Sequence, residues 1–363
     1  MKPEMSRGGT PRIKAYINGM VIDSVIHTEI TASTTGRGGR LDLTLSTNNE
    51  IFDRQWPRRI VEPITAAISV YDAFMESEVQ IFDGLANNII YDPIRKIVHI
   101  QGSDYSSVLA NSTIQNAFVN NTASEIAFQI ARRHGFDFDI TATLAMVGSY
   151  RSGDHNQMLL NSHSKFTNEW DLLTYLARSE KFELHVDGKT LVFRPYIKSR
   201  YGNEILKMQN MKSIKFNKRC APSGKTTVVV KSWNSWLNQA LSHEGEQALD
   251  PSDGDHVGTP NDRSDGFVII RPNLSLMDTK QLSQEYLEIL NELECTVDIV
   301  MPGEVSLRPH GLMTIIGSDT IFDQEYVVRS VRRCFSATRG FFQYVRGTTV
   351  SSNTMNPLLP AMS

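Results

Sequence analysis

Few segments of this 363-residue chain carry residues of the type and spacing that chemistry requires. Ser223-Gly-Lys-Thr226 resembles the end of a phosphate-binding loop, in which backbone N–H groups and a lysine hold a nucleotide. Such a loop needs a glycine five residues before its Gly-Lys pair, where this chain has Arg219, and it needs a helix afterwards. Because TTVVVK from Thr226 is typical of a strand, we interpret the segment as a β-turn with an exposed lysine.

The segment Asp250–Asp265, DPSDGDHVGTPNDRSD, has enough carboxylates to suggest calcium binding. The calcium loop of an EF-hand has a glycine at its sixth position together with a glutamate at its twelfth, and this order is absent from the segment. We therefore expect a solvated acidic stretch within a long exposed loop, Ser242–Gly266, which is rich in Asp, Gly, Pro and Ser.

The nine histidines include no HExxH motif. His155 and His163 flank a polar loop, but no carboxylate accompanies them at the spacing of a metal ligand or a general base. His185 and Glu183 are predicted on the outer face of a hairpin, where His185 is interpreted as a surface residue. No GxSxG motif or cysteine nucleophile context occurs. We predict no catalytic, cofactor-binding or metal-binding residue, and hence a protein that is not an enzyme and needs no cofactor.

Composition argues against several classes of partner. A net charge of −3 provides no concentrated basic surface, so we expect no nucleic acid partner. No apolar run approaches the roughly 20 residues of a membrane helix, and Met1–Lys14 lacks the apolar core of a secretory signal. Cys220, Cys295 and Cys334 are odd in number and far apart, which fits reduced thiols in a cytosolic protein better than a disulfide framework or a zinc site.

The most regular unit is Trp170–Pro195, in which a helix leads directly into a hairpin. Thr167 and Asn168 precede the helix and can accept the N–H groups of its first turn. The apolar positions recur at three- and four-residue spacing and share one helical face: Trp170, Leu173, Leu176 and Ala177.

Asp187-Gly188 predicts a two-residue type I′ turn, because both residues tolerate a positive φ. This turn sets a register in which Leu184 opposes Leu191 and Phe182 opposes Phe193. These four side chains would share the buried face of the hairpin, which packs on its own helix.

Residues Arg12 to about Tyr105 are rich in strand patterns separated by Gly-rich or Pro-bearing breaks. Asn18-Gly19 marks a hairpin turn. The predicted strands are Val21–Ile30, Leu41–Leu45, Ile64–Tyr71, Glu78–Phe82, Ala86–Tyr91 and Lys96–Gln101.

From Thr122 the apolar period becomes helical. Thr122-Ala-Ser-Glu125 is a capping box, and a glycine, Gly135, closes the helix. A strand-like FDFDI follows. The apolar stripe of this helix consists of Ile126, Ala127, Ile130 and Ala131.

From Lys212 the pattern returns to strands, with one helix that we expect Asp278-Thr-Lys-Gln281 to cap. The buried side of this helix is predicted at Leu282, Tyr286, Leu287, Leu290 and Leu293. The predicted strands are Ser213–Asn217, Thr226–Ser232, Leu312–Ile316, Glu325–Cys334 and Phe341–Arg346.

Two hairpins echo one another. IFDGLANNIIYD…KIVHIQG from Ile81 and IFDQEYVVRSVRRCF…GFFQYVRG from Ile321 both consist of Ile-Phe-Asp, a long strand, a turn, a second strand and a closing glycine. Two readings are open: a chance match between two hairpins, or first and last thirds that are copies of one β-domain.

Three segments, read in order, resemble the baseplate hub proteins of contractile-tailed phages, the late control protein D family, and the hub half of type VI secretion spike proteins. The first is VHIQGSDYSSVLANS from Val98, and the second runs from TASEIAFQIARRHGFDFDI to TNEWDLLTYLARSEKFELHVDGKTLVFRP. The third joins VSLRPHGLMTIIG with EYVVRSVRRCFSATRGFF. The resemblance covers most of residues 10–347 and departs from the family's usual Pro-Gly at Pro309-His310-Gly311.

The resemblance implies an α+β, mainly β fold with two similar β-barrel-like tube domains, residues 10–110 and 206–350. An α+β domain, residues 111–205, is inserted between them, and residues 351–363 form a frayed tail. The second tube domain carries the long loop and one helix. This helix–hairpin insert then has a structural task, which is consistent with the lack of chemical groups in it.

The resemblance further implies a homotrimer whose six tube domains form a pseudo-six-fold ring in the baseplate of a virion tail, assembled in the host cytoplasm. The ring would join the six-fold tail tube to a three-fold central spike. The implied partners are the spike or tip protein, the tail tube or tube-initiator protein, and further a tape-measure protein and the baseplate wedge.

Two other classes of function remain as alternatives. A tail-associated cell-wall hydrolase would normally display a carboxylate pair or a metal motif, and none is evident. A carbohydrate-binding β-module would use Trp233 and Trp236, whose rings could stack on sugars, although this spacing is more common in a core or an interface.

Overall fold

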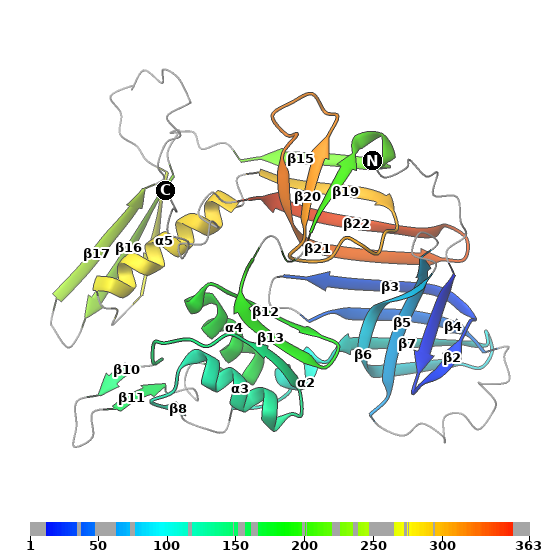
Figure 1. Cartoon of the computed structure of the whole chain (residues 1–363), viewed down its shortest axis with the longest axis horizontal. Coiled ribbons are helices and arrows are strands. Elements are labelled where there is room, and N and C mark those ends of the chain that lie inside the picture. The colour runs from blue at the N-terminus through cyan, green and yellow to red at the C-terminus, as the bar shows by residue number, and fades with distance from the viewer. Residues whose placement is uncertain are drawn as a thin grey trace, which may run out of the picture.

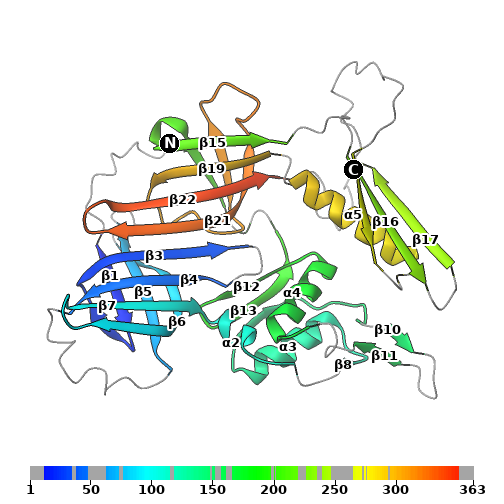
Figure 2. The ribbon, with the colours of Figure 1, turned by 180° about the vertical axis from the view of Figure 1, so that it is seen from behind.

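The computed structural model shows a long twisted sheet, an α+β unit beside it and an arm that projects from one side (Figure 1). Figure 2 shows the same arrangement from behind. The fold is mainly β with large antiparallel sheets, in agreement with the predicted class. The structure describes residues 12–34, 38–47, 63–72, 77–114, 118–147, 149–151, 157–160, 166–197, 200, 202–219, 226–234, 239–246, 265–271, 274, 276–292 and 295–350.

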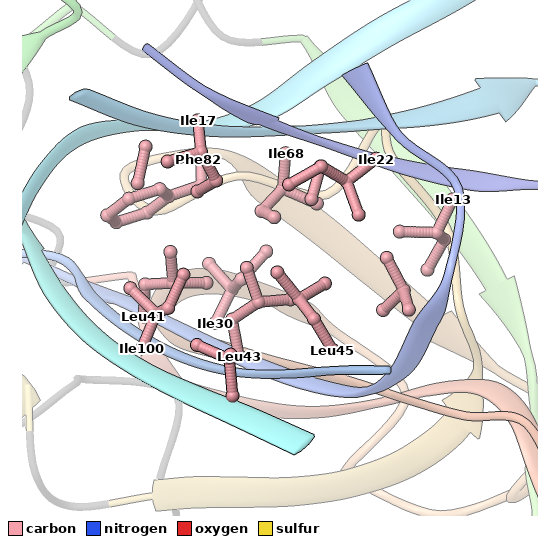
Figure 3. Close-up of a cluster of buried hydrophobic side chains, with 14 of the residues drawn as sticks. Ile13, Ile17, Ile22, Ile30, Leu41, Leu43, Leu45, Ile68, Phe82 and Ile100 are labelled. Atoms are coloured by element: carbon pink, nitrogen blue, oxygen red, sulfur yellow. The ribbon is translucent and has the colours of Figure 1, made fainter. Parts of the chain in front are cut away.

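The first part of the long sheet comes from the first hundred residues. Its strands lie in the order β3-β4-β7-β6-β5-β1-β2, and all neighbours are antiparallel. Their inward side chains fill the aliphatic core of Figure 3, in which Leu43, Leu45, Ile68 and Ile100 are fully buried. The strands are β1 (Ile13–Ile17), β2 (Met20–Ile22), β3 (Val25–Ser33), β4 (Arg40–Ser46), β5 (Thr65–Asp72), β6 (Ser77–Asp92) and β7 (Ile97–Asp104).

The second part of the sheet comes from the last third of the chain. Its order is β15-β19-β22-β21, with β20 antiparallel to β21 and β14 parallel to β20. A separate core beneath it includes Val297, Met313 and Tyr326. The elements are β14 (Asn203–Lys207), the 3₁₀ helix η4 (Met208–Asn210), β15 (Ser213–Lys218), β19 (Cys295–Pro302), β20 (Leu312–Ile316), β21 (Glu325–Ser336) and β22 (Gly340–Thr349).

The two parts join at a seam between β3 and β21. These strands pair antiparallel, from Ser330 opposite Ser33 to Ser336 opposite His27. Figure 1 shows the seam where the blue β3 lies beside the orange-red β21. Because of this seam, the strands from both ends of the chain belong to one 13-stranded sheet.

The two parts have the same strand order. When β15, β19, β22, β21 and β20 are matched with β3, β4, β7, β6 and β5, each of the four antiparallel pairings recurs. The match ends at β14, which pairs with β20 in parallel, whereas β1 pairs with β5 antiparallel.

The matched strands also share their register. The β6–β7 pairing shifts just after Ala86, which lies opposite Gly102, and the β21–β22 pairing shifts just after Val328, which lies opposite Gly347. At Gly102 an added Cβ would meet the Leu85 carbonyl oxygen, and at Gly347 it would meet the end of the Met313 side chain, so both positions leave little room for a side chain. A β-bulge at the same place in two hairpins is a specific structural feature.

The echo between the hairpins is therefore structural, but its sequence alignment is two residues out of register. The shared Ile-Phe-Asp aligned Ile81 with Ile321, whereas the bulges match Ala86 with Val328. Ile81 lies inside β6, and Ile321 lies in a turn before β21. The three identical letters thus occupy different structures, and pairing and bulge position set the true register.

The α+β unit packs around the apolar faces of α3 and α4. Tyr105 and Leu109 extend this core from the end of β7 and from α2. β13 pairs antiparallel with β12 and parallel with β9. The elements are α2 (Ser106–Ala110), β8 (Phe118–Val119), α3 (Ala123–Arg133), β9 (Asp137–Ile140), β10 (Ser149–Arg151), β11 (Gln157–Leu160), α4 (Glu169–Glu180), β12 (Phe182–Asp187) and β13 (Thr190–Pro195).

Both helix starts predicted within this unit are confirmed. Thr122 Oγ1 accepts the Glu125 N–H, and the Thr122 N–H donates to Glu125 Oε2 at 2.9 Å, which completes the capping box. Asn168 is the N-cap of α4 and accepts the Asp171 N–H at 2.8 Å. The predicted apolar faces of α3 and α4 are buried, and Gly135 has a φ of +69° after α3.

The register predicted for the hairpin is wrong by two residues. Leu184 lies opposite Phe193, not Leu191, and Phe182 lies opposite Pro195. The loop residues are Gly188 and Lys189, and a positive φ at Gly188 alone is the pattern of a type II′ turn. The shared apolar face survives, because a shift of two residues leaves each partner on the same face.

Within its described residues, the arm consists of a three-stranded sheet, in the order β17-β16-β18, and one helix that lies on it. Figure 1 shows it to the left of the body, apart from the long sheet. The elements are β16 (Thr226–Asn234), β17 (Gln239–Glu246), β18 (Asp265–Ile270) and α5 (Leu276–Glu292).

Two predictions for the arm are corrected. The helix begins at Leu276, two residues before the expected cap at Asp278. Ser242–Glu246 belongs to β17 and Asp265 begins β18, so the ends of the expected loop are strands. The composition of these residues is typical of a loop. Their backbone nevertheless pairs with β16, and this pairing makes them strands.

Two strand predictions in the first third also differ from the structure. The expected strand Val21–Ile30 is divided between β2 and β3, whereas the expected strands Glu78–Phe82 and Ala86–Tyr91 form the single strand β6. Gly84 interrupts the apolar pattern, but its backbone continues to pair with both β5 and β7. Composition suggested a break there, and backbone pairing carries the strand through it.

Candidate assembly surfaces

The residues that suggested chemistry do not gather at one site. Within the described ranges, no three His, Cys, Asp or Glu side chains are placed to hold a metal ion. Thr226 begins β16, so a strand follows the phosphate-loop-like segment as predicted, while Ser223–Lys225 lie outside the described residues. Also outside them lie residues 247–264 of the expected loop, His155, His163, Cys220, Trp236 and the tail 351–363.

His185 is not the surface residue that the sequence suggested. The outer face of the hairpin turns towards the long sheet, where the His185 ring lies against the His310 ring at 5.4 Å between centroids and 32° between planes. Burial lowers the pKa of both histidines, and that of His310 falls to about 3. Two neutral imidazoles therefore fill the contact between the α+β unit and the second part of the sheet.

Glu183, on the same face of the hairpin, is also buried, with 3% of its surface exposed. Its Oε1 accepts a hydrogen bond from Arg194 Nε at 2.7 Å, directly across the hairpin. Arg200 Nη1 lies 3.8 Å from the same oxygen, and Arg194 also pairs with Asp139 on β9. A buried carboxylate with two cationic partners fixes the hairpin against β9 and the following segment.

Arg333 is a third buried polar group at this junction. Its guanidinium donates to the backbone carbonyls of Glu304, Val305 and Leu307. Burial lowers the pKa of Arg333 to about 10. Arg333 lies on β21 opposite Ile30 of β3, so this side chain braces the seam from within.

A cavity of about 360 Å³ lies where the α+β unit and both parts of the sheet meet. Its polar lining includes Asp83, Asp104, His185, Arg308 and His310. Asp104 accepts hydrogen bonds from the backbone N–H groups of Gly39 and Ser106, and burial raises its pKa. The polar groups of this cavity thus hold loops and strands together.

Trp233 is half-exposed on the outer face of β16, which α5 does not cover. Val268 and Ile270 of β18 lie on this face as well, at 55% and 74% exposure. The arm therefore presents an apolar strip.

No helix in the described part of the chain is long and apolar enough to cross a membrane.

The long sheet contains strands with unused edges. Among the described residues, β15 pairs only with β19, and the second half of β6, Asn87–Asp92, pairs only with β7. Backbone N–H and C=O groups along such edges can pair with another strand. These two edges are consequently candidate surfaces for assembly.

Comparisons with known proteins give a consistent fold. No protein-family model matches the sequence, and no curated protein matches it. Among solved structures, the chain is similar to a 43 kDa tail protein of prophage MuSo2 from Shewanella oneidensis, with a TM-score of 0.67, 14% identity, and coverage of 96% of this chain and 100% of that one.

Two further structures share the fold. One is a tail protein from Neisseria meningitidis MC58, with a TM-score of 0.65, 11% identity, and coverage of 94% of this chain and 97% of that one. The other is an E. coli component of the type VI secretion system, with a TM-score of 0.56, 12% identity, and coverage of 93% and 77%. The chain therefore has, over nearly its whole length, the fold of these tail and secretion-system proteins.

Proposed function

We propose that this protein is the baseplate hub of a contractile phage tail, a structural protein that assembles as a homotrimer. The observation that carries the proposal is the repeated strand order, with the same bulge and register, in one chain. Two copies of one β-domain in each chain give three chains six equivalent units. Such a ring matches a six-fold tube on one side and a three-fold spike on the other.

The domains of this proposal are residues 10–110 and 206–350, which form barrel-like tube domains, and residues 111–205, which form the inserted domain. Three separate clusters of buried residues support this division. Tyr105 and Leu109 pack into the core of the inserted domain, so α2 belongs to that core. The His185–His310 contact ties the insert to the second tube domain, and Tyr105 and Leu109 tie it to the end of the first, so the task of the insert in this proposal is to hold the two tube domains at a fixed angle.

The similar solved structures support a role in a tail, because two are tail proteins and one is a component of a related secretion machine. The proposed location is the virion tail baseplate, after assembly in the host cytoplasm. The proposed partners are the spike or tip protein, the tail tube or its initiator, the tape-measure protein and the wedge.

The open edges supply the physical drive for assembly. Unpaired strand edges tend to associate, and closed symmetry stops that association at a defined number of subunits. A ring built in this way would bury a large obligate interface, of more than about 2,000 Å².

Light scattering coupled to size exclusion, with electron microscopy of the purified protein, tests the proposal. The expected result is a particle of three chains that forms a ring with three-fold symmetry and six similar lobes. A stable monomer at micromolar concentration would contradict it.

The alternatives have their own readouts. Cleavage of purified peptidoglycan by the isolated chain would support a tail-associated hydrolase. Glycan binding that Trp233→Ala abolishes would support the carbohydrate-binding module, for which the half-exposed indole of Trp233 is the specific observation. The hub proposal expects neither activity.

A further inference from the structure

The β3–β21 seam inside the chain is a pairing that a neighbouring subunit would repeat at the free edges of the long sheet. β21 corresponds to β6 and β3 corresponds to β15 in the two repeated parts. β21 and β3 are the two strands that pair at the seam inside the chain. Their counterparts, β6 and β15, both carry an unused edge among the described residues.

The residue correspondence follows from the bulges and the paired registers. Val328 matches Ala86 through the bulge, so Arg332 matches Ile90 and Arg333 matches Tyr91. The other strand of the seam is β3, whose counterpart is β15. In β3, Ile30 lies opposite Leu41, and in β15, Phe216 lies opposite Val297, the residue that corresponds to Leu41. Since Leu41 faces Gly102 and Val297 faces Gly347, these two pairs are equivalent.

We propose that β15 of one subunit pairs antiparallel with the second half of β6 of the next, in the register of the β3–β21 seam. The seam places Arg332 opposite Thr31 and Arg333 opposite Ile30. By equivalence, Ile90 then lies opposite Asn217 of the partner subunit, and Tyr91 lies opposite Phe216 of the partner subunit. This inference rests on the proposed ring and specifies the residues that close it.

The side chains at the two edges are suited to this pairing. Ile90 is 50% exposed and Tyr91 is 40% exposed, which is high for apolar side chains in a strand of a large sheet. Phe216 stacks on Phe322 at 4.8 Å between ring centroids and remains partly exposed at the rim of the second core. Tyr91 would extend that aromatic group across the interface, as cross-strand aromatic pairs do.

The charges agree with the same register. One step further along, Cys334 lies opposite Glu29 at the seam, and the equivalent pair is Asp92 opposite Lys215 of the partner subunit. Asp92 uses its Oδ1 to accept the N–H groups of Ile94 and Arg95, which holds the carboxylate at the end of the strand. An opposite charge across an antiparallel pair is favourable, and a shift of one residue would separate the two charges.

Disulfide trapping tests the register. Directly opposite residues in antiparallel strands have Cα atoms about 4.5–5.5 Å apart, within the range that a disulfide bridges, whereas diagonal residues are too far apart. The test variant is Ile90→Cys with Asn217→Cys, and the matched control is Ile90→Cys with Lys215→Cys, which is displaced by two residues. Both carry Cys220→Ser so that this thiol forms no links, while Cys295 and Cys334 are buried.

Under mild oxidation, the test variant is expected to give covalent dimers and trimers on non-reducing gels, about ten-fold more than the control, because only its thiols reach disulfide distance. Trimer should be the largest product, since the ring closes at three. A control that cross-links as fast as the test variant would overturn the register.

A second measurement uses the natural chain and does not depend on the variants. Hydrogen exchange of the assembled protein should be slow at Ser213–Lys218 and at Asn87–Asp92, because pairing protects edge amides. A trimer in which both segments exchange freely overturns this pairing and leaves the hub proposal standing. A chain that remains monomeric overturns both.

Discussion

At the scale of single residues, the junction between the inserted unit and the sheet depends on groups that are buried in their neutral or paired form. His185 and His310 face one another, with Glu183, Asp187 and Asp139 nearby and Arg194 and Arg329 as the neighbouring cations. Tyr196 Oη donates to the His310 carbonyl at 2.8 Å, which holds this segment in place. Protonation of His310 would put a charge into this buried contact, close to the cations Arg194 and Arg329.

The pH dependence of stability follows from His310. Its pKa is about 3 in the folded chain and 6.5 for an unperturbed histidine, so the unfolded state binds more protons between these values. Stability is therefore complete above pH 6.5 and is lost as the pH falls towards 3. One such histidine lowers the free energy of unfolding by about 2 kcal/mol between about pH 7.5 and pH 5.

Urea unfolding of the natural chain and of His310→Asn at about pH 7.5 and pH 5 measures this effect. Asparagine tolerates the positive φ of 68° at this position and does not titrate, so the variant should lose less stability on acidification. Equal losses in both proteins would show that His310 is not the sensitive group.

Gly188 tests the hairpin turn. Its φ of +56° is costly for a β-branched residue, so Gly188→Val should lower the free energy of unfolding by roughly 1 kcal/mol or more. Lys189→Val is the matched control, because Lys189 occupies the second loop position without a positive φ. Thermal denaturation that shifts equally in both variants would contradict the turn described above.

At the scale of elements, the helices begin where side chains satisfy their first N–H groups. In α3 this is reciprocal, since Thr122 and Glu125 each bond the backbone of the other. The bond from the Thr122 backbone lowers the pKa of Glu125. The fully buried stripe of Ile126 and Ile130 then seats the helix in the core of the inserted unit.

Thr122→Ala removes one half of this box. The expected loss is about 1 kcal/mol of unfolding free energy, the usual cost of an N-cap hydroxyl. Glu125→Gln is the control, because an amide oxygen can still accept the Thr122 N–H. Denaturant titration followed by far-ultraviolet circular dichroism measures both, and a larger loss in the control would assign the effect to charge instead of capping.

At the scale of the whole molecule, the sheet runs without interruption from β15 to β2 and contains strands from both the first and the last third of the chain. Ser330–Ser336 pairs with residues about three hundred positions earlier, so neither part of the sheet completes its edge without the other. The unused edges at β6 and β15 repeat the same arrangement towards a neighbouring subunit under the proposed ring.

This arrangement predicts that stability depends on protein concentration. Partners that bind only the folded state raise its stability by mass action, so the melting temperature should rise between low and high micromolar concentration. Differential scanning fluorimetry over a dilution series measures this. A melting temperature that does not change across the series, together with a monomeric mass, would contradict assembly through the edges.

The sequence alone determined the local features whose causes lie within a few residues. The capping box at Thr122, the N-cap at Asn168, the turn at Asn18-Gly19 and the apolar faces of two helices are all found where spacing predicted them. Period and capping depend on neighbours three or four positions away, so they can be read without the fold.

Strand pairing and the surroundings of the outer hairpin face depend on contacts between distant parts of the chain, so they could be learned only from the fold. A period-two pattern gives the same alternation for registers two residues apart, which is why the Leu184 pairing was wrong, and the Ile81 alignment was wrong because three identical letters outweighed the strand pairing. Glu183 and His185 are polar. Glu183 is buried because Arg194 pairs with it across the hairpin, and His185 is buried against His310, which is more than a hundred residues away in the sequence. The seam and the matching free edges likewise arise from backbone pairing over long distances, for which local composition carries no signal.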